Sequence, residues 1–119
     1  MTNEQFAGTI VGLVSYWGSA ALFYGIGVWA SRSKNPVNFW AGTKPDPQRV
    51  SDVTAYNHEN AVMWKLYSVP LWLAGALSIF DFVSQAFAIA GLALAGLACF
   101  PGLVILIRHY RKIENKYID

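Results

Sequence analysis

The residues best suited to chemistry lie together, directly before an apolar run, in the stretch DVTAYNHENAVMWKLYSVPLWL (52–73). The stretch holds an imidazole, a carboxyl group, two amides and an ammonium group, which belong to Asn57, His58, Glu59, Asn60 and Lys65. Imidazole and carboxyl groups are common general acids and bases. Neighbouring residues of a helix point about 100° apart, so His58 and Glu59 do not form a metal pair by themselves.

Helical spacing places Asn57, Asn60 and Trp64 where they could point together into a bundle of helices. Amide groups buried at that depth need hydrogen-bond partners, which another helix, a ligand or water could supply. We therefore take the polar cluster, together with Trp64, as the candidate site for binding a ligand or partner. The alternative is that these polar residues only end and anchor a membrane span at the interface.

The rest of the sequence offers no recognisable catalytic motif. It contains no Gly-x-Ser-x-Gly, no phosphate loop and no pair of carboxylates in one span. The zincin pattern of two histidines four residues apart is absent, although His58 and His109 could share a site on one side of a membrane. The single cysteine, Cys99, cannot form an intramolecular disulfide. We expect no metal, no cofactor and no catalytic residues, and an enzyme is the less favoured class.

The elements that must position the cluster are transmembrane helices. Hydrophobic residues make up 55% of the chain and charged residues 13%, about half of the share usual in soluble domains. Residues 6–30 and 84–107 carry no charge, and each run exceeds the roughly 20 residues that cross a bilayer. A further span fits at about 61–82 if Lys65 reaches the headgroups. The sequence predicts one all-α polytopic membrane domain, residues 1–119, with three transmembrane helices; a soluble helical domain is the alternative.

Basic residues fall on one side of this arrangement. They lie between the first and second spans, at the start of the second, and after the third: Arg32, Lys34, Lys44, Arg49, Lys65, Arg108, Arg111, Lys112 and Lys116. The positive-inside rule makes that side cytoplasmic, with the N-terminus outside and the C-terminus in the cytoplasm. We expect a multi-pass protein of the bacterial cytoplasmic membrane, whose net charge of +2 reflects topology and contact with membrane lipids, with no nucleic acid as partner.

Two cytoplasmic segments follow from this topology, a loop-helix at 31–60 and a basic tail at 108–119. Prolines and glycines break the first part of the loop into turns. Ser51 or Asp52 can then cap a helix that continues into the second span. That helix should bend near Pro70.

Small residues recur at helical spacing in the first and third spans and would let helices approach closely. They are Gly8, Gly12, Ser15 and Ser19 in the first span, and Gly91, Ala95 and Cys99 in the third. Either these stripes pack the three spans together, or they join copies of the chain into a homo-oligomer. Pro101 should kink the third span. The short link at 81–85 requires an antiparallel hairpin, with Asp81 as a solvated helix end or, alternatively, a functional carboxylate.

The stretch NFWAGTKPDPQRVSDVTAYNHENAVMWKLYSVPLWLAGAL (38–77) resembles a pattern in small uncharacterised membrane proteins of Gram-positive bacteria. There, an aromatic-Gly loop leads through a Pro/Val segment into a Tyr-Asn helix ahead of a Trp-rich span. The stretch is also remotely similar to the SdpI-like immunity proteins, small polytopic proteins that protect a cell from its own toxin. The resemblance implies ligand or partner binding through Trp40, Gly42, Asn57, Asn60 and Trp64.

The sequence thus favours a small accessory, regulatory or immunity protein that binds a partner or ligand at the cytoplasmic membrane interface. Its expected partners are membrane lipids, further copies of the chain, and a peptide or protein. Two alternatives stay open. The small-residue stripes would suit a homo-oligomeric pore or small transporter, and His58 with Glu59 would suit a membrane enzyme acting on lipid or peptide.

Overall fold

The structure is a computed structural model that describes residues 2–37 and 47–118. These residues form helices and connecting turns, with one isolated antiparallel bridge between Val50 and Ile118. The elements are α1 (Asn3–Arg32), the short 3-10 helix η1 (Pro47–Arg49), α2 (Val53–Ser78), α3 (Gln85–Cys99) and α4 (Pro101–Tyr117). The predicted all-α class is confirmed.

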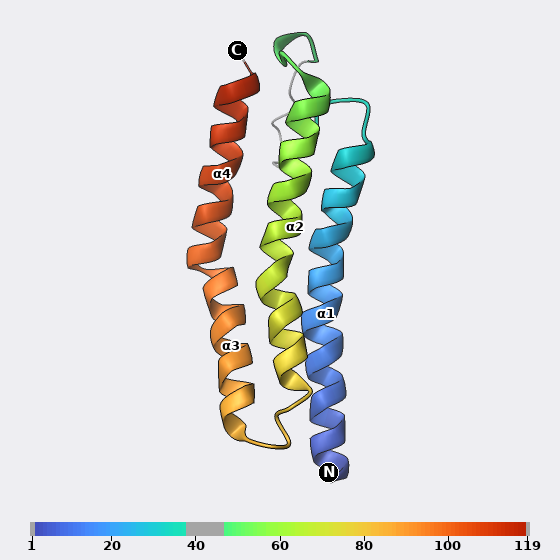
Figure 1. The fold of residues 1–119 in the computed structure, drawn as a ribbon, viewed down its shortest axis with the longest axis vertical. Helices are drawn as coiled ribbons and strands as arrows, with labels where there is room; N and C mark the ends of the chain where they lie inside the picture. Colours follow the sequence, from blue (N-terminus) through green and yellow to red (C-terminus); the bar gives the residue numbers. More distant parts are fainter. Residues whose placement is uncertain (1, 38–46, 119) are drawn as a thin grey trace.

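The helices form a rod of 58 × 24 × 22 Å in which α2 lies between α1 and the α3–α4 pair (Figure 1). Helix α2 runs antiparallel to both neighbours, while α3 and α4 follow one another along the same side of it. The predicted hairpin between the second and third apolar segments is therefore present. We call the end of the rod where α1 and α4 finish and α2 begins the basic end.

Local sequence explains where α1 and α2 begin. The hydroxyl of Thr2 accepts a hydrogen bond from the backbone N–H of Gln5, and the Gln5 side chain accepts one from the N–H of Thr2. Asp52, one of the two predicted caps, accepts a hydrogen bond from the N–H of Ala55 at 3.0 Å. Helix α2 then continues past Pro70, where the sequence predicts a bend, and remains one helix to Ser78.

The third apolar segment is interrupted where the sequence predicted a kink. The break lies directly before Pro101, which lacks the N–H that would continue the helix. The next residue is Gly102, where a Cβ would lie only 2.9 Å from the backbone oxygen of Leu97, so the close approach of the chain here suits glycine. The Tyr67 hydroxyl donates a hydrogen bond of 2.8 Å to the carbonyl of Ala98, which ties the break to α2.

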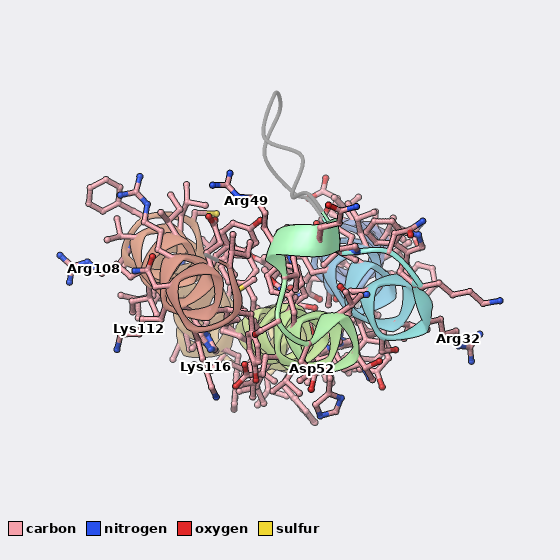
Figure 2. All side chains as sticks on the ribbon, turned by 90° about the horizontal axis from the view of Figure 1, so that it is seen from above. Arg32, Arg49, Asp52, Arg108, Lys112 and Lys116 are labelled. Carbon is pink, nitrogen blue, oxygen red and sulfur yellow. The ribbon has the colours of Figure 1, made fainter. Side chains whose placement is uncertain are left out.

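The segment 108–119, expected to be a basic tail, belongs mostly to α4, which runs to Tyr117. Tyr110 and Ile113 are buried in the core at the basic end. Arg108 and Lys112 extend away from the bundle, as the view onto this end shows (Figure 2). The tail is therefore an amphipathic helix that covers the first turns of α2 with its apolar face.

The contact between α1 and α2 includes one position of the predicted stripe together with residues outside it. Of the predicted stripe, Gly12 does face α2, since an added Cβ would lie 3.2 Å from the Cβ of Ser78. Ser15 and Ser19 are exposed, and a Cβ on Gly8 would meet nothing within 4 Å. The buried residues of α1 are Thr9, Ala20, Gly27 and Ala30.

The stripe predicted on the third segment is correct at one position. A Cβ on Gly91 would lie 3.3 Å from the backbone oxygen of Ala74, so α3 and α2 approach closely there. Ala95, one turn further along, is half-buried, and Cys99 is exposed. The small residues of α2 thus decide which faces of its neighbours are buried.

Candidate functional site

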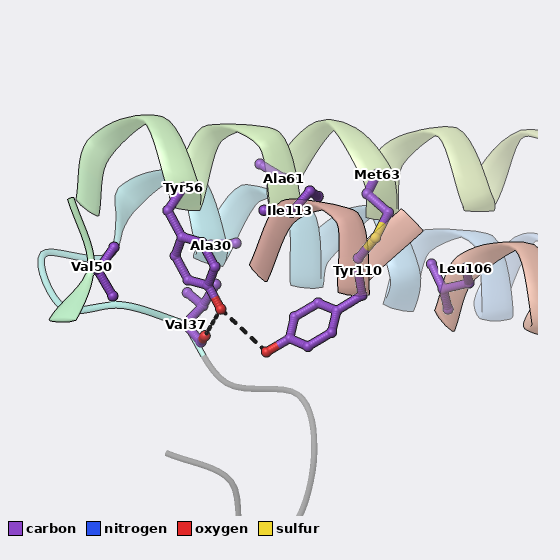
Figure 3. Close-up of a cluster of buried hydrophobic side chains, with 9 residues drawn as sticks. All are labelled: Ala30, Val37, Val50, Tyr56, Ala61, Met63, Leu106, Tyr110 and Ile113. Carbon is purple, nitrogen blue, oxygen red and sulfur yellow. Dashed lines mark hydrogen bonds between the residues drawn. The ribbon is translucent and has the colours of Figure 1, made fainter. Parts of the chain in front are cut away.

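The predicted polar cluster lies in the same turns of α2 as Tyr56, Ala61 and Met63, which belong to a core of buried apolar side chains. Figure 3 shows this core at the basic end. This core draws on α1, the segments directly after α1 and directly before α2, α2 itself and α4: Ala30, Val37, Val50, Tyr56, Ala61, Met63, Leu106, Tyr110 and Ile113. Residues that the sequence suggested for ligand binding are therefore part of, or next to, the best-buried region of the fold.

Asn57 holds the chain that leaves α1. Its side-chain amide donates hydrogen bonds to the carbonyls of Ser33 at 3.0 Å and Asn35 at 2.9 Å. Its side-chain oxygen accepts a hydrogen bond of 3.0 Å from the N–H of Val37. Asn57 is only 2% exposed. Asn57 points into the bundle, as expected from its spacing. Both of its side-chain donors bond to the backbone of the protein, so Asn57 serves as a structural clamp in this fold.

Tyr56 fixes the same segment from the neighbouring position. Its hydroxyl donates to the carbonyl of Val37 at 3.1 Å and lies 3.2 Å from the hydroxyl of Tyr110 (Figure 3). Because the single proton of Tyr56 goes to Val37, Tyr110 must donate to the oxygen of Tyr56. Burial raises the pKa of both phenols. The sequence did not indicate this tyrosine pair, which links α2, the segment after α1, and α4.

Asn60 and Trp64 also face inward, as expected from their spacing with Asn57. Asn60 is fully buried, and its amide donates to the carbonyl of Tyr56 at 2.9 Å, one turn earlier in the same helix. Trp64 is half-buried and stacks on Phe23 of α1 with ring centroids 5.7 Å apart. Trp64 therefore packs α2 against α1, whereas the hydrogen bond of Asn60 stays within α2.

The outward-facing part of the cluster consists of His58 and Glu59. His58 is exposed, and Glu59 forms an ion pair of 3.1 Å with Lys116 of α4. The hydroxyl of Tyr117, and then the ammonium of Lys116, lower the pKa of the Glu59 carboxyl. The two side chains that could act as an acid/base pair thus have separate surroundings, because Glu59 is tied to α4.

Lys65 has a partner within the protein. Its stem lies over Gly27, where an added Cβ would be 2.9 Å from Cγ of Lys65. Its ammonium lies 5.3 Å from the ring centroid of Tyr24, which is a cation–π contact. The sequence predicted that Lys65 reaches lipid headgroups. It did not indicate the contact with Tyr24 of α1.

Two of the predicted residues, Trp40 and Gly42, lie outside the described residues. Within the described ranges, no three His, Cys, Asp or Glu side chains are grouped closely enough to hold a metal ion. The described surface of the cluster offers ion pairing and hydrogen bonding.

Asp81, at the end opposite the basic end, is half-buried and accepts a hydrogen bond of 3.0 Å from the hydroxyl of Thr9. It borders a small cavity of about 160 Å³ that Tyr16 and Ser78 also line. Asp81 is thus a partly exposed group at the end of α2 that also links this end to α1.

A long apolar groove, which the sequence analysis missed, runs between α2 and the α3–α4 pair. Its volume is about 550 Å³. It is lined by Met63, Leu66, Tyr67, Pro70, Leu94, Leu97, Ala98, Pro101, Gly102, Ile105, Leu106 and His109. Toward the basic end, Ile105 and His109 also line a second hollow of about 380 Å³, together with Arg108 and Lys112. The apolar groove therefore leads directly to a group of basic side chains.

The fold and these surfaces define a class of protein rather than a particular one. It is an all-helical rod in which Asn3–Arg32 and Gln85–Tyr117 are long and apolar enough to cross a membrane. Helix α2 is not among these segments, since its first half carries the polar cluster. The chain matches no protein-family model, no curated protein and no solved structure. A function must therefore be argued from the residues themselves.

Proposed function

We propose that this chain is a small multi-pass protein of the bacterial cytoplasmic membrane that acts by binding a partner or ligand at its basic end. In this proposal three helical segments cross the bilayer, with the N-terminus outside and the C-terminus in the cytoplasm. An accessory, regulatory or immunity role, as in the SdpI-like proteins that the sequence resembles, is the form of binding we favour.

The observation that carries the membrane location is the exposure of large apolar side chains along the rod. Phe100 is 80% exposed, Val14 is 69% and Ile105 is 66%. Of an apolar stretch of 18 residues in α1 only 11% is buried, and of a stretch of the same length in Gln85–Tyr117 only 17%. Apolar surface this extensive and continuous suits lipid as the surrounding solvent.

The position of α2 supports a third span. Because α2 lies between α1 and the α3–α4 pair, a bilayer that both neighbours cross would enclose α2 as well (Figure 1). Its polar first turns lie at the basic end, where the rod of 58 Å extends beyond a hydrocarbon core of about 30 Å. The described arginines and most lysines gather at this end, which favours the cytoplasmic side for it.

The orientation predicts a specific labelling pattern. In a Cys99→Ser background, Asn3→Cys should react with a membrane-impermeant maleimide in intact spheroplasts, and Asn115→Cys should not. Inverted vesicles should give the reverse pattern. Both original residues are exposed, so the substitutions should leave the fold unchanged. Labelling of both positions from the same side would contradict three spans.

Binding at the basic end is supported by the way the surface there is held. The clamp of Asn57 and the pair of Tyr56 and Tyr110 fix the segment after α1 against α2 and α4. On the outer face of α2, Thr54 and His58 are exposed one helical turn apart. A surface fixed in this way can recognise a partner without a large ordering cost.

Photo-crosslinking in cells tests this binding role. A photoreactive residue at Thr54 or at His58 should give an adduct of one fixed mass. The same residue at Ile10, which is exposed near the opposite end, should not. Absence of a discrete adduct at both Thr54 and His58, or the same adduct at Ile10, would contradict a binding surface at the basic end.

A homo-oligomeric pore is the second function that a specific observation favours. The small residues Gly8, Ser15 and Ser19 of α1 are exposed in the single chain and would allow other copies to approach closely. Ion or solute flux through proteoliposomes would support this alternative, and a monomer without flux would remove it.

A further inference from the structure

We propose that the groove between α2 and the α3–α4 pair holds one anionic phospholipid, with an acyl chain along the groove and the phosphate at Arg108, His109 and Lys112. This inference rests on the proposed membrane location. It concerns a surface apart from the Asn57 clamp and from the exposed face of His58.

The groove has the form that a single lipid chain would fill. Its outer edges are apolar and open, with Leu66 59% exposed, Leu97 60% and Ile105 66%. The Tyr67 hydroxyl within it already donates to the carbonyl of Ala98, so that polar group is satisfied before any ligand arrives. Buried apolar side chains form the floor: Met63, Ala98 and Leu106.

The groove also has the right length and depth. From Leu94 to His109 it extends about 22 Å along the helix direction at 1.5 Å per residue. Half of a hydrocarbon core is about 15 Å thick, so such a groove would reach from near the bilayer centre into the headgroup region. Pro70 lies at its deep end and His109 at its basic end, which orients a bound lipid with its headgroup beside α4.

The charge at the shallow end selects an anionic headgroup. Arg108 and Lys112 extend outward beside the hollow that continues the groove (Figure 2). In the described ranges, the ion pair with a carboxylate is that of Glu59 with Lys116, so Arg108 and Lys112 keep their charge available. Guanidinium and ammonium groups are the side chains that bind phosphate oxygens.

A site of this kind differs from general attraction between a basic surface and an acidic membrane. Arg32 and Lys34, at the end of α1, are exposed like Arg108 and Lys112 but line none of the described grooves. Diffuse attraction would involve both pairs equally, whereas a lipid seated in the groove would depend on Arg108 and Lys112 alone.

Native mass spectrometry of the full chain from nanodiscs with equal phosphatidylglycerol and phosphatidylcholine tests the headgroup contact. The unaltered protein should retain one phosphatidylglycerol in preference to phosphatidylcholine. Arg108→Gln with Lys112→Gln should lower this retention roughly tenfold or more. Arg32→Gln with Lys34→Gln, which removes the same charge, should leave it unchanged.

A second pair of variants tests the groove itself without changing any charge. Leu97→Trp should fill the groove and abolish retention. Ile89→Trp places the same ring on α3 at a residue that is also 60% exposed but does not line the groove, and should retain the lipid. Unchanged helical circular dichroism would establish that both variants fold.

Equal retention of the two lipids would overturn the inference, as would equal loss in both pairs of charge variants or full retention by Leu97→Trp. A second copy of the chain held in place of a lipid would do the same. The maleimide pattern of positions 3 and 115, measured on the same preparations, distinguishes failure of the lipid site from failure of the proposed membrane location. An inserted protein without lipid preference removes only this site, whereas a protein that does not insert removes the membrane proposal.

Discussion

Asn57→Leu should destabilise the protein by about 2–4 kcal/mol, because leucine has a similar size but cannot make any of the three hydrogen bonds of the amide. The N–H of Val37, a residue only 2% exposed, would lose its partner in the core. The carbonyls of Ser33 and Asn35 would lose theirs in a partly exposed turn. A buried polar group left without a partner costs about 1–3 kcal/mol, so the N–H of Val37 should dominate the loss.

Denaturant unfolding in detergent micelles, followed by far-ultraviolet circular dichroism, measures this change. His58→Leu is the matched control, since it introduces the same side chain at the next residue, which is exposed. It should shift the free energy of unfolding by about 0.5 kcal/mol at most. Equal stability of the two variants would show that Asn57 is no clamp. If Asn57→Leu abolished the adduct formed by a photoreactive residue at position 58 but left the free energy of unfolding unchanged, Asn57 would be a ligand contact after all.

The sequence was sufficient to predict the helical framework, because its strongest signals are local. Two charge-free runs of membrane length predict two of the long helical segments. A capping residue such as Asp52 and a helix breaker such as Pro101 act on their immediate neighbours, so their effects follow from position alone.

The basic charges of segment 108–119 do not indicate its helical structure, but its apolar periodicity does. Leu106, Tyr110, Ile113 and Tyr117 recur at spacings of four, three and four residues, which is the apolar stripe of an amphipathic helix. All four belong to α4, and three of them are buried. The signal was therefore present in the sequence, and it leads directly to the partner of Tyr56.

The role of the polar cluster could not follow from sequence in the same way. Spacing correctly placed Asn57 and Asn60 on an inward face of α2. Asn57 bonds there to the backbone of residues 33–37, which lie 20 to 24 positions earlier in the chain, and nothing in their sequence indicates this contact. A buried amide has the same appearance in a sequence whether its partner is a ligand or the chain itself, so only the three-dimensional arrangement separates the two roles.

The face of α1 that packs against α2 could not be predicted from the sequence either, because it depends on the partner helix. Small residues occur all around this helix, so any of several stripes would permit close approach. Helix α2 decides between them, because Gly75 accommodates the ring of Trp17 and the backbone of Ala61 lies against Gly27. Two glycines of α1 that are alike in sequence can therefore differ completely in what surrounds them.

Gly27→Ala and Gly25→Ala should change stability in opposite directions. A Cβ at Gly27 would lie 2.8 Å from the backbone oxygen of Ala61 and 2.9 Å from Cγ of Lys65, while one at Gly25 would meet nothing within 4 Å. Alanine favours a helix over glycine by roughly 0.5–1 kcal/mol, so Gly25→Ala should stabilise the protein by about that amount. At Gly27 the helices must separate, and overpacking of about 1–3 kcal/mol outweighs the same gain.

Helix separation at Gly27 would also move the stem of Lys65 and weaken the contact of its ammonium with the ring of Tyr24. Gly27→Leu should therefore cost more than Gly27→Ala, by about 3 kcal/mol or more in total, because a longer side chain forces α1 and α2 further apart. Unfolding in mixed micelles with increasing sodium dodecyl sulfate measures all three variants against the unaltered chain. If Gly27→Ala stabilised the protein as much as Gly25→Ala, α1 and α2 could not meet at this face. The proposal of a third span would then fail, because it depends on the position of α2 between its neighbours.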